Sequence, residues 1–367
     1  MPALHTITIK GFKSIADVEK LELRSINVVI GPNGSGKSNF IGAFSFLHAI
    51  REGRLQAYVA DAGGADKVLH FGSKTTQEIY IDLQFWQTNR YEITLRPNAN
   101  DELVPFREVA WFFGDRIGRW TDRVLQRKGN EAGISGSDLT EPIARHVRDD
   151  LSRWRVYHFH DTSTSSPMKR TGDLNDNRLF RSDGSNLAAY LYFLKSKHPE
   201  SYGLIKGTVR LVAPFFDDFV LEPMRLNSEK IRLEWRHVGS DAYYDASSMS
   251  DGSIRFIALA TLLLQPFHLR PSVILIDEPE LGLHPYAITM LASLIKQAAV
   301  QTQVIVSTQS ALLLDNFDPE DVLVANRAEG STTFKRLSSA PLAEYLTEYS
   351  LGQLWEKNEI GGRPGGR

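Results

Sequence analysis

The sequence GPNGSGKS at residues 31–38 constrains the fold of this chain more than any other segment. It fits the pattern G-x-x-x-x-G-K-[ST], in which glycines let the backbone turn so that successive N–H groups point at phosphate oxygens. An apolar run at 26–30 precedes it, and Phe40, Phe44 and Leu47 follow at helical spacing. Strand, glycine loop and helix are the context that a phosphate-binding loop requires. We therefore expect a nucleotide site in an α/β fold.

Each residue type in this loop, called the phosphate loop below, suits the binding of ATP. Lys37 adds positive charge at the β- and γ-phosphates, and the Ser38 hydroxyl is a ligand for Mg²⁺. The alternative is a glycine turn with a solvated lysine, which the flanking strand and helix make less favourable. The residues that we expect to contact ATP are Asn33, Gly34, Ser35, Gly36, Lys37, Ser38 and Asn39.

A second motif, VILIDE at residues 273–278, places two acids after four apolar residues. A buried parallel strand would carry them to its carboxyl end, where α/β proteins bind their ligands. Asp277 is predicted to hold Mg²⁺, directly or through water, and Glu278 to polarise the attacking water as general base. The alternative is an acidic loop after a core strand.

Composition excludes several classes of protein. The 367 residues contain 42 Lys plus Arg against 44 Asp plus Glu, which argues against a strongly basic nucleic-acid binder. Cysteine is absent, so disulfides, thiol catalysis and cysteine-based zinc sites are excluded. The longest apolar run, residues 257–264, is far below the roughly 20 residues that span a membrane. We expect a cytoplasmic protein without a membrane segment.

Hydrophobic periodicity predicts the elements around these motifs. We expect a strand at 6–12, a hairpin over 79–95, and a loop with a short strand at 97–110. Buried strands are expected at 273–276 and 304–306, and an edge hairpin at 322–325 and 334–337. Helices are predicted at 252–264, after Pro285, and from a cap at Asn186 through Leu194.

Several motifs together resemble a known family. The sequence SDGS at 250–253, followed by Arg255, resembles the signature motif of ABC-type ATPases, and more narrowly of their SMC/RecF/OLD-like branch. IKGFKS at 9–14, DEPE at 277–280 and LHP at 283–285 match the same branch, as does the 27-residue step from Ser250 to Asp277. The resemblance covers about residues 1–60 and 245–325.

The resemblance implies a P-loop NTPase of the ABC-ATPase head type. Its fold class is α/β, with a mixed sheet core, a β-rich lobe and a helical insertion lobe. The expected divisions are an N-terminal ATPase lobe at 1–160, a helical lobe with strands at 161–250, a C-terminal ATPase lobe at 251–340, and a C-terminal helix with a flexible tail at 341–367.

The resemblance also implies a composite active site with ATP and Mg²⁺. Two heads form a homodimer, head to tail, with ATP between them. One head supplies the phosphate loop and the acids, and the other supplies Ser250, Gly252 and Ser253. An alternative for Ser250 is a helix cap, and both roles are compatible.

Two positions depart from the family pattern. After the last buried strand, the family usually carries His where this chain has Gln309, which donates a hydrogen bond but carries no charge. We therefore expect slow turnover, or a nucleotide-gated scaffold that does not hydrolyse ATP. The family also carries a Q-loop glutamine after a strand that joins the nucleotide lobe to the helical lobe. This chain has no glutamine at that junction, and His160 or Asp161 would make the contact with the metal or water instead. Gln84 is the competing candidate.

Other binding features have weaker sequence signals. Lys13 and Ser14 are family-style candidates for adenine recognition. The residues Arg116, Arg119, Arg123 and Arg127 sit three or four apart, which predicts one stripe of a helix. That stripe would bind nucleic-acid phosphates, or it would be a solvated face with local ion pairs, the reading we favour.

The expected output is control of a separate effector protein, a nuclease or a toxin, in prokaryotic anti-phage defence. This follows from the resemblance, because short ATPases of this branch often look like sensors in defence systems. No coiled-coil repeat separates Lys37 from Ser250, and the 58 residues after Gln309 are too few for a Toprim nuclease. The alternative is a RecF-like repair ATPase on duplex DNA, which would lose affinity steeply with salt.

Overall fold

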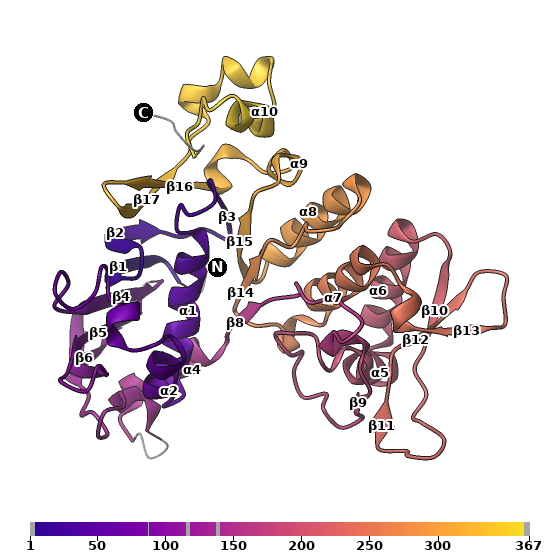
Figure 1. Cartoon of the computed structure of the whole chain (residues 1–367), viewed down its shortest axis with the longest axis horizontal. Coiled ribbons are helices and arrows are strands. Elements are labelled where there is room, and N and C mark those ends of the chain that lie inside the picture. Colours follow the sequence, from indigo (N-terminus) through magenta and orange to yellow (C-terminus); the bar gives the residue numbers. More distant parts are fainter. Residues whose placement is uncertain (1–3, 87, 115–117, 137–139, 363–367) are drawn as a thin grey trace.

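The computed structural model of the chain describes residues 4–86, 88–114, 118–136 and 140–362. Two six-stranded sheets organise it, with a helical region on the far side of the second sheet (Figure 1). The N-terminal strands, indigo to purple in Figure 1, form the outer sheet. Strands from both ends of the chain form the central sheet, which carries the phosphate loop.

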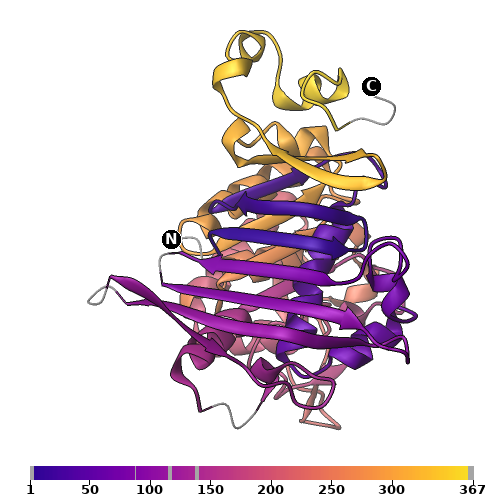
Figure 2. The same cartoon turned by 90° about the vertical axis from the view of Figure 1, so that its left-hand side faces the viewer.

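The outer sheet is antiparallel, with the order β2-β1-β4-β5-β6-β7. Figure 2 looks onto this sheet. Along β4, Ile79, Ile81 and Leu83 are buried and alternate with half-exposed residues, as expected for a sheet with one face on the core. Its strands are β1 (Thr6–Phe12), β2 (Ile15–Glu22), β4 (Ile79–Phe85), β5 (Asn89–Pro97), β6 (Leu103–Gly114) and β7 (Arg119–Val124).

The central sheet has the order β17-β16-β3-β15-β14-β8 and is parallel except for β17. Both faces of its inner strands are covered, so β3 and β14 are almost continuously apolar. In β3, Val28 and Ile30 face one hydrophobic core while Val29 faces the other. Its strands are β3 (Ile26–Ile30), β8 (Trp154–Tyr157), β14 (Val273–Asp277), β15 (Gln303–Thr308), β16 (Val322–Ala328) and β17 (Ser331–Arg336).

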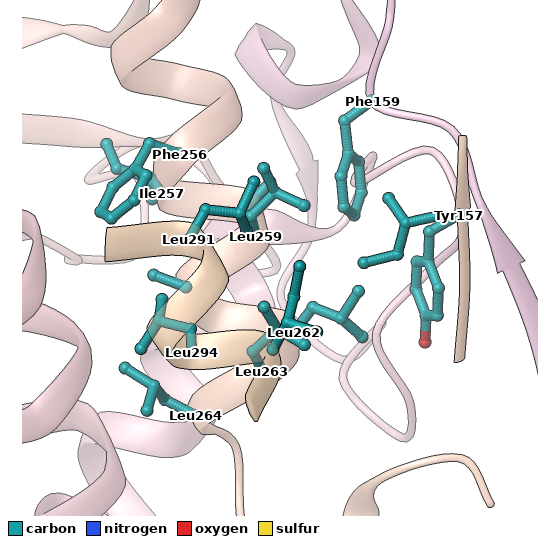
Figure 3. Packing of buried hydrophobic residues seen from close by; sticks show 14 of the residues in the cluster. Tyr157, Phe159, Phe256, Ile257, Leu259, Leu262, Leu263, Leu264, Leu291 and Leu294 are labelled. Atoms are coloured by element: carbon teal, nitrogen blue, oxygen red, sulfur yellow. The ribbon is translucent and has the colours of Figure 1, made fainter. Parts of the chain in front are cut away.

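Helix α1 (Lys37–Arg51) lies between the two sheets, where Phe40, Phe44 and Leu47 join side chains of both sheets in one core. The second core lies on the other face of the central sheet and is centred on α7 (Asp251–Leu264) and α8 (Pro285–Ala299) (Figure 3). The remaining helices are α2 (Leu55–Asp61), α3 (Ala65–Val68), α4 (Pro142–Ser152), α5 (Leu187–Lys197), α6 (Pro199–Val212), α9 (Ala311–Leu314) and α10 (Leu351–Glu356).

The expected mixed-sheet core, β-rich lobe and helical insertion lobe are all present. The insertion contains α5, α6 and two small sheets, and it lies to the right in Figure 1. Its strands are β9 (Gly172–Asp173), β10 (Phe216–Val220), β11 (Lys230–Ile231), β12 (Glu234–His237) and β13 (Tyr243–Asp245). Within the described parts of the chain, none of the helices has the length and apolar character that crossing a membrane requires.

Three local predictions are wrong. Arg119 and Arg123 lie in strand β7 rather than in a helix, and Arg116 lies outside the described residues. Residues 103–114 form one long strand where a loop with a short strand was expected. Asn186 does precede α5, but its side chain makes no cap bond; its Oδ1 accepts from the backbone N–H of Arg181 at 3.0 Å.

Candidate functional site

The phosphate loop joins the end of β3 to the start of α1, as its motif predicts. Gly34 and Gly36 have φ values of 78° and 101°, the left-handed region that favours glycine. Packing adds a second constraint at Gly36, where a Cβ atom would lie 2.0 Å from Thr332 Oγ1 on β17. The loop thus brings the free N–H groups at the start of α1 to its concave side.

Lys37 is 6% exposed at the first position of α1. Its Nζ donates to the loop carbonyls of Gly31 at 2.7 Å and Pro32 at 3.1 Å. Burial lowers the pKa of Lys37, and the carboxylates at the end of β14 oppose that shift. The lysine and the acids therefore lie in one electrostatic neighbourhood, while Ser38 on the next helical position is exposed.

A hydrogen-bond network fixes the loop to segments far away in the sequence. Asn39 Nδ2 donates to Ser14 Oγ at 2.8 Å, and Ser14 Oγ shares a 2.7 Å hydrogen bond with Thr332 Oγ1. Thr332 Oγ1 also donates to the carbonyl of Ser35 at 2.8 Å. Ser14, a predicted candidate for adenine recognition, thus lies beside the loop, and no sequence motif pointed to Thr332.

A cavity of about 730 Å³ opens next to this network. Lys13, Ser14 and Asn39 line one part of it, and the exposed ring of Phe71 and Arg327 line another. Partial burial lowers the pKa of Lys13. The cavity combines an aromatic face with polar groups at the position where Lys13 and Ser14 were predicted to recognise adenine.

The two acids of the second motif leave the central sheet beside β15, where Asp277 pairs with Ser307. Glu278 has a φ of 43°, and its N–H donates to the Ser307 carbonyl at 2.8 Å. Asp277 Oδ1, Ser307 Oγ and Ser35 Oγ are buried and have no hydrogen-bond partner among the described residues. Unpartnered buried oxygens are costly, so this edge of the sheet is built to meet a further polar group.

Gln309 lies directly over these acids. Its Nε2 donates to Glu278 Oε1, and its backbone N–H donates to Glu280 Oε1 at 3.2 Å. Glu280 also accepts from Thr308 Oγ1 at 2.6 Å, and burial raises the pKa of its carboxyl group. Sequence reasoning gave Glu280 no role, although its motif was recognised; the structure makes it the anchor of the Gln309 turn.

The signature motif begins helix α7. Ser250 is exposed, and its Oγ accepts from the backbone N–H of Ser253 at 3.1 Å, so it caps the helix as one reading predicted. At Gly252 a Cβ atom would lie 2.4 Å from the carbonyl oxygen of Gly282, just after the acids. The exposed start of α7 therefore packs against residues 277–282 of its own chain, called the acidic turn below, and remains open to solvent.

The structure distinguishes the three candidates for the Q-loop contact, which are His160 and Asp161 after β8 and Gln84. One nitrogen each of His158 and His160 and one oxygen of Asp277 lie within 4.8 Å of one another. The Asp161 side chain instead accepts from the N–H of Ser163 at 3.1 Å within its own turn. Gln84 is in β4 of the outer sheet and pairs with β1.

Arg123 of the predicted arginine stripe binds within the chain. Its Nε lies 3.5 Å from Glu141 Oε1. This contact agrees with the favoured interpretation of local ion pairs, each of which contributes little to stability.

Comparisons with known proteins agree with this geometry. Over 159 residues the chain is 31% identical to the chromosome partition protein Smc of Mycobacterium leprae, and over 45 residues it is 58% identical to that of Desulfitobacterium hafniense. These matches cover 42% and 12% of this chain. The chain spans only 11% and 4% of the length of these two curated relatives.

Two solved SMC heads share the fold over nearly the whole chain. An Smc head bound to the C-winged helix domain of ScpA aligns with a TM-score of 0.55 and 18% identity, over 92% of this chain and 98% of the other. An Smc head with an extended coiled coil, bound to the C-terminal domain of ScpA derived from Pyrococcus furiosus, aligns with a TM-score of 0.54 and 15% identity, over 95% and 99%.

A family model described as "AAA domain, putative AbiEii toxin, Type IV TA system" matches residues 26–315. That span contains the phosphate loop, the acidic turn, the signature helix and Gln309. The chain therefore belongs to this AAA domain family, and it shares the fold of the SMC heads.

Proposed function

We propose that this protein binds and hydrolyses ATP, that ATP holds two copies together head to tail, and that this cycle controls a separate effector protein in anti-phage defence. One observation carries the proposal. The phosphate loop, the acidic turn and Gln309 meet at one edge of the central sheet, while the start of the signature helix of the same chain is exposed.

The loop side of the site suits a triphosphate. Lys37 Nζ would exchange its bonds to the carbonyls of Gly31 and Pro32 for bonds to phosphate oxygens, and the first N–H groups of α1 would complete the cradle. The adenine would occupy the cavity beside Lys13 and Ser14, where Phe71 offers an exposed ring face.

The residues present also fit Mg²⁺. Ser38 offers a hydroxyl and Asp277 a carboxylate, the hard oxygen ligands that Mg²⁺ prefers. The buried, unpartnered Oδ1 of Asp277 supports this fit. When bound, Mg²⁺ neutralises charge on the phosphate oxygens. Asp161 is a weaker candidate ligand, because its carboxylate is engaged with Ser163.

For hydrolysis, Glu278 would orient the attacking water and accept its proton at a carboxylate oxygen. Gln309 Nε2 donates to that carboxylate and would hold its orientation. Because an amide does not ionise, Gln309 itself adds no pH dependence to this contact. Glu280 positions Gln309 through the backbone N–H of the turn.

In the dimer, the second copy would supply the groups that close the site on the side of the γ-phosphate. Ser250, Gly252 and Ser253 of one copy would close over the nucleotide of the other, with the N–H groups at the start of α7 facing the phosphates. Exposure of Ser250 supports access by a second copy. Closure would exclude water and strengthen the electrostatic effect of Lys37 on the transition state.

Control of an effector is supported by the family description, which names a toxin–antitoxin system. It is also supported by the two similar SMC heads, each bound to a domain of another protein in its structure. In this proposal the effector is a separate nuclease or toxin that binds one nucleotide state of the dimer.

The test uses the mass of Glu278→Gln in solution with and without ATP and Mg²⁺. Slowed hydrolysis should trap a species of twice the 41.3 kDa chain mass with ATP, and a monomer without it. Lys37→Met should remain monomeric, because it lacks the phosphate contact. Ser250→Arg should bind ATP yet stay monomeric, whereas Ser196→Arg, on an exposed face of α5, should dimerise normally.

A Glu278→Gln variant that remains monomeric while binding ATP would contradict the ATP-held dimer. Turnover must be measured on the same proteins. Equal rates for wild type and Glu278→Gln would show that Glu278 is not the base, and a wild type without turnover would favour the nucleotide-gated scaffold.

A further inference from the structure

The neighbouring strands β8 and β14 place two histidines and an aspartate close together. Strand β8 pairs in parallel with β14, and the register places Tyr157 opposite Ile276. The next residues, His158 and Asp277, therefore leave the same edge of the sheet side by side. This follows from the register of the two strands.

The alternation of the chain after β8 separates apolar from polar side chains. Tyr157 and Phe159 are buried in the core against α7, and Figure 3 shows both rings on the side of the α7 leucines. Because alternate residues of extended backbone face opposite sides, His158 and His160 share the other side. Their rings are 6.1 Å apart, centroid to centroid.

The three side chains approach a metal-binding geometry. One nitrogen of each histidine and one oxygen of Asp277 lie within 4.8 Å of one another. Ligand atoms bound at about 2.1 Å from one ion lie no more than about 4.2 Å apart, so small side-chain rotations would close the set.

The backbone that carries the histidines is held in place. Arg255, 4% exposed on α7, donates to the carbonyl of Phe159 at 2.9 Å and to that of His160 at 3.1 Å. The N–H of His158 donates to the Ser182 carbonyl at 2.9 Å. The ligand-bearing segment is therefore built on fixed supports, which favours a preformed site.

The chemistry of the donors is also in place. Asp277 Oδ1 is buried without a hydrogen-bond partner among the described residues, so it is open to a cation. A neutral imidazole is the form that binds metal ions.

We propose that His158, His160 and Asp277 form a binding site for a divalent first-row transition metal ion. Two imidazole nitrogens with one carboxylate suit Zn²⁺, Co²⁺ or Fe²⁺, whereas Mg²⁺ favours an all-oxygen set. Three protein ligands leave further positions open to water. The site needs no nucleotide, although it shares Asp277 with the Mg²⁺ site proposed above.

The experiment titrates Co²⁺ into protein purified without a histidine tag and without nucleotide. We expect one ion per chain, visible absorption bands from the bound Co²⁺, and no displacement by excess Mg²⁺. His158→Asn and His160→Asn should each weaken binding more than about 10-fold, since loss of a ligand costs at least as much as loss of a supporting contact. His237→Asn, an exposed histidine on β12, should bind like wild type.

Each variant is first checked for folding by its thermal unfolding midpoint, and a variant that unfolds early is replaced by the phenylalanine or glutamine variant of the same residue. Wild-type protein without Co²⁺ bands, or His160→Asn and His237→Asn with equal affinities, would overturn the site. Binding of a fluorescent ATP analogue with Mg²⁺ is measured on the same preparations. Loss of ATP binding with intact Co²⁺ binding would count against the proposed function alone.

Discussion

At the scale of single residues, Glu278 carries the main constraint of the site. Its φ of 43° is in the left-handed region, which costs a non-glycine residue about 1–3 kcal/mol. The conformation turns the chain sharply after Asp277, so that consecutive acids face different directions. The hydrogen bond from the Glu278 N–H to Ser307 and the bond from Gln309 offset part of this cost.

A second residue-scale feature gives a prediction away from the site. Glu108 on β6 is 2% exposed and accepts hydrogen bonds from Tyr91 Oη at 2.9 Å, Gly133 N at 2.6 Å and Ile134 N at 3.0 Å. Burial raises the pKa of the Glu108 carboxyl group, and these hydrogen bonds only partly oppose that rise. A raised pKa means that the folded state holds this proton more tightly than the unfolded state, so stability falls as the pH rises from the ordinary glutamate range through the raised value.

We therefore expect Glu108→Gln to flatten the fall in stability between about pH 4 and pH 8, even though its amide fits the two N–H groups less well. The measurement is the urea midpoint of unfolding across that range. Glu78→Gln, at a partly exposed residue just before β4 whose ion pair with Arg96 lies at the surface, is the control and should follow wild type. Parallel pH profiles for Glu108→Gln and wild type would refute the expectation.

Sequence patterns identified the site residues whose chemistry is encoded locally. Lys37, Asp277 and Glu278 stand in short motifs whose strand and helix context could be predicted from hydrophobic runs. Thr332 could not be found this way, because its role comes from packing against Gly36 about 300 positions away, and a threonine in an edge hairpin has no distinguishing pattern.

At the scale of elements, the start of α7 packs closely against the acidic turn. Gly252 approaches the Gly282 carbonyl too closely for any side chain. The start of the signature helix therefore packs directly against the turn that follows Glu278.

Gly252→Ala should reduce the free energy of unfolding by about 1–3 kcal/mol, because its Cβ would lie 2.4 Å from the Gly282 oxygen. Urea unfolding measures the change. Gly203→Ala in α6 is the matched control, since nothing lies within 4 Å of its Cβ position and alanine is the better helix former by up to about 1 kcal/mol. Equal effects of the two substitutions would mean that the close approach is not rigid.

The arginine stripe shows where periodicity fails to assign an element. Arg119, Arg123 and Arg127 are spaced by four, and this spacing returns to the same face in a helix and in a strand. The pairing of β7 with β6 decides for the strand, and that pairing depends on residues outside the stripe. Elements set by buried runs, such as β14 and β15, had no such ambiguity.

At the scale of the whole molecule, the phosphate loop is one of the places where the two sheets meet. Thr332 on β17 of the central sheet contacts Ser14, which lies between β1 and β2 of the outer sheet, and it donates to Ser35 of the loop. A relative shift of the two sheets would therefore strain these hydrogen bonds to the loop.

Thr332→Val keeps the shape of the side chain and removes its hydroxyl. It should reduce the free energy of unfolding by about 1–3 kcal/mol, because the Ser35 carbonyl loses its buried donor. It should also weaken binding of a fluorescent ATP analogue. Thr333→Val, exposed on the same strand, should change neither by more than about 0.5 kcal/mol. An unchanged ATP affinity in Thr332→Val would show that the loop holds its shape without the hairpin.

The same network has a consequence for synthesis of the protein. The contacts of Thr332 with Ser14 and with Ser35 of the loop join segments 318 and 297 residues apart, and such long-range contacts form slowly. A nascent chain on the ribosome completes the nucleotide pocket only after β17 has left the exit tunnel. Until then residues 31–38 lack their hydrogen bond from Thr332, and we expect the incomplete chain to bind ATP more weakly than the finished one.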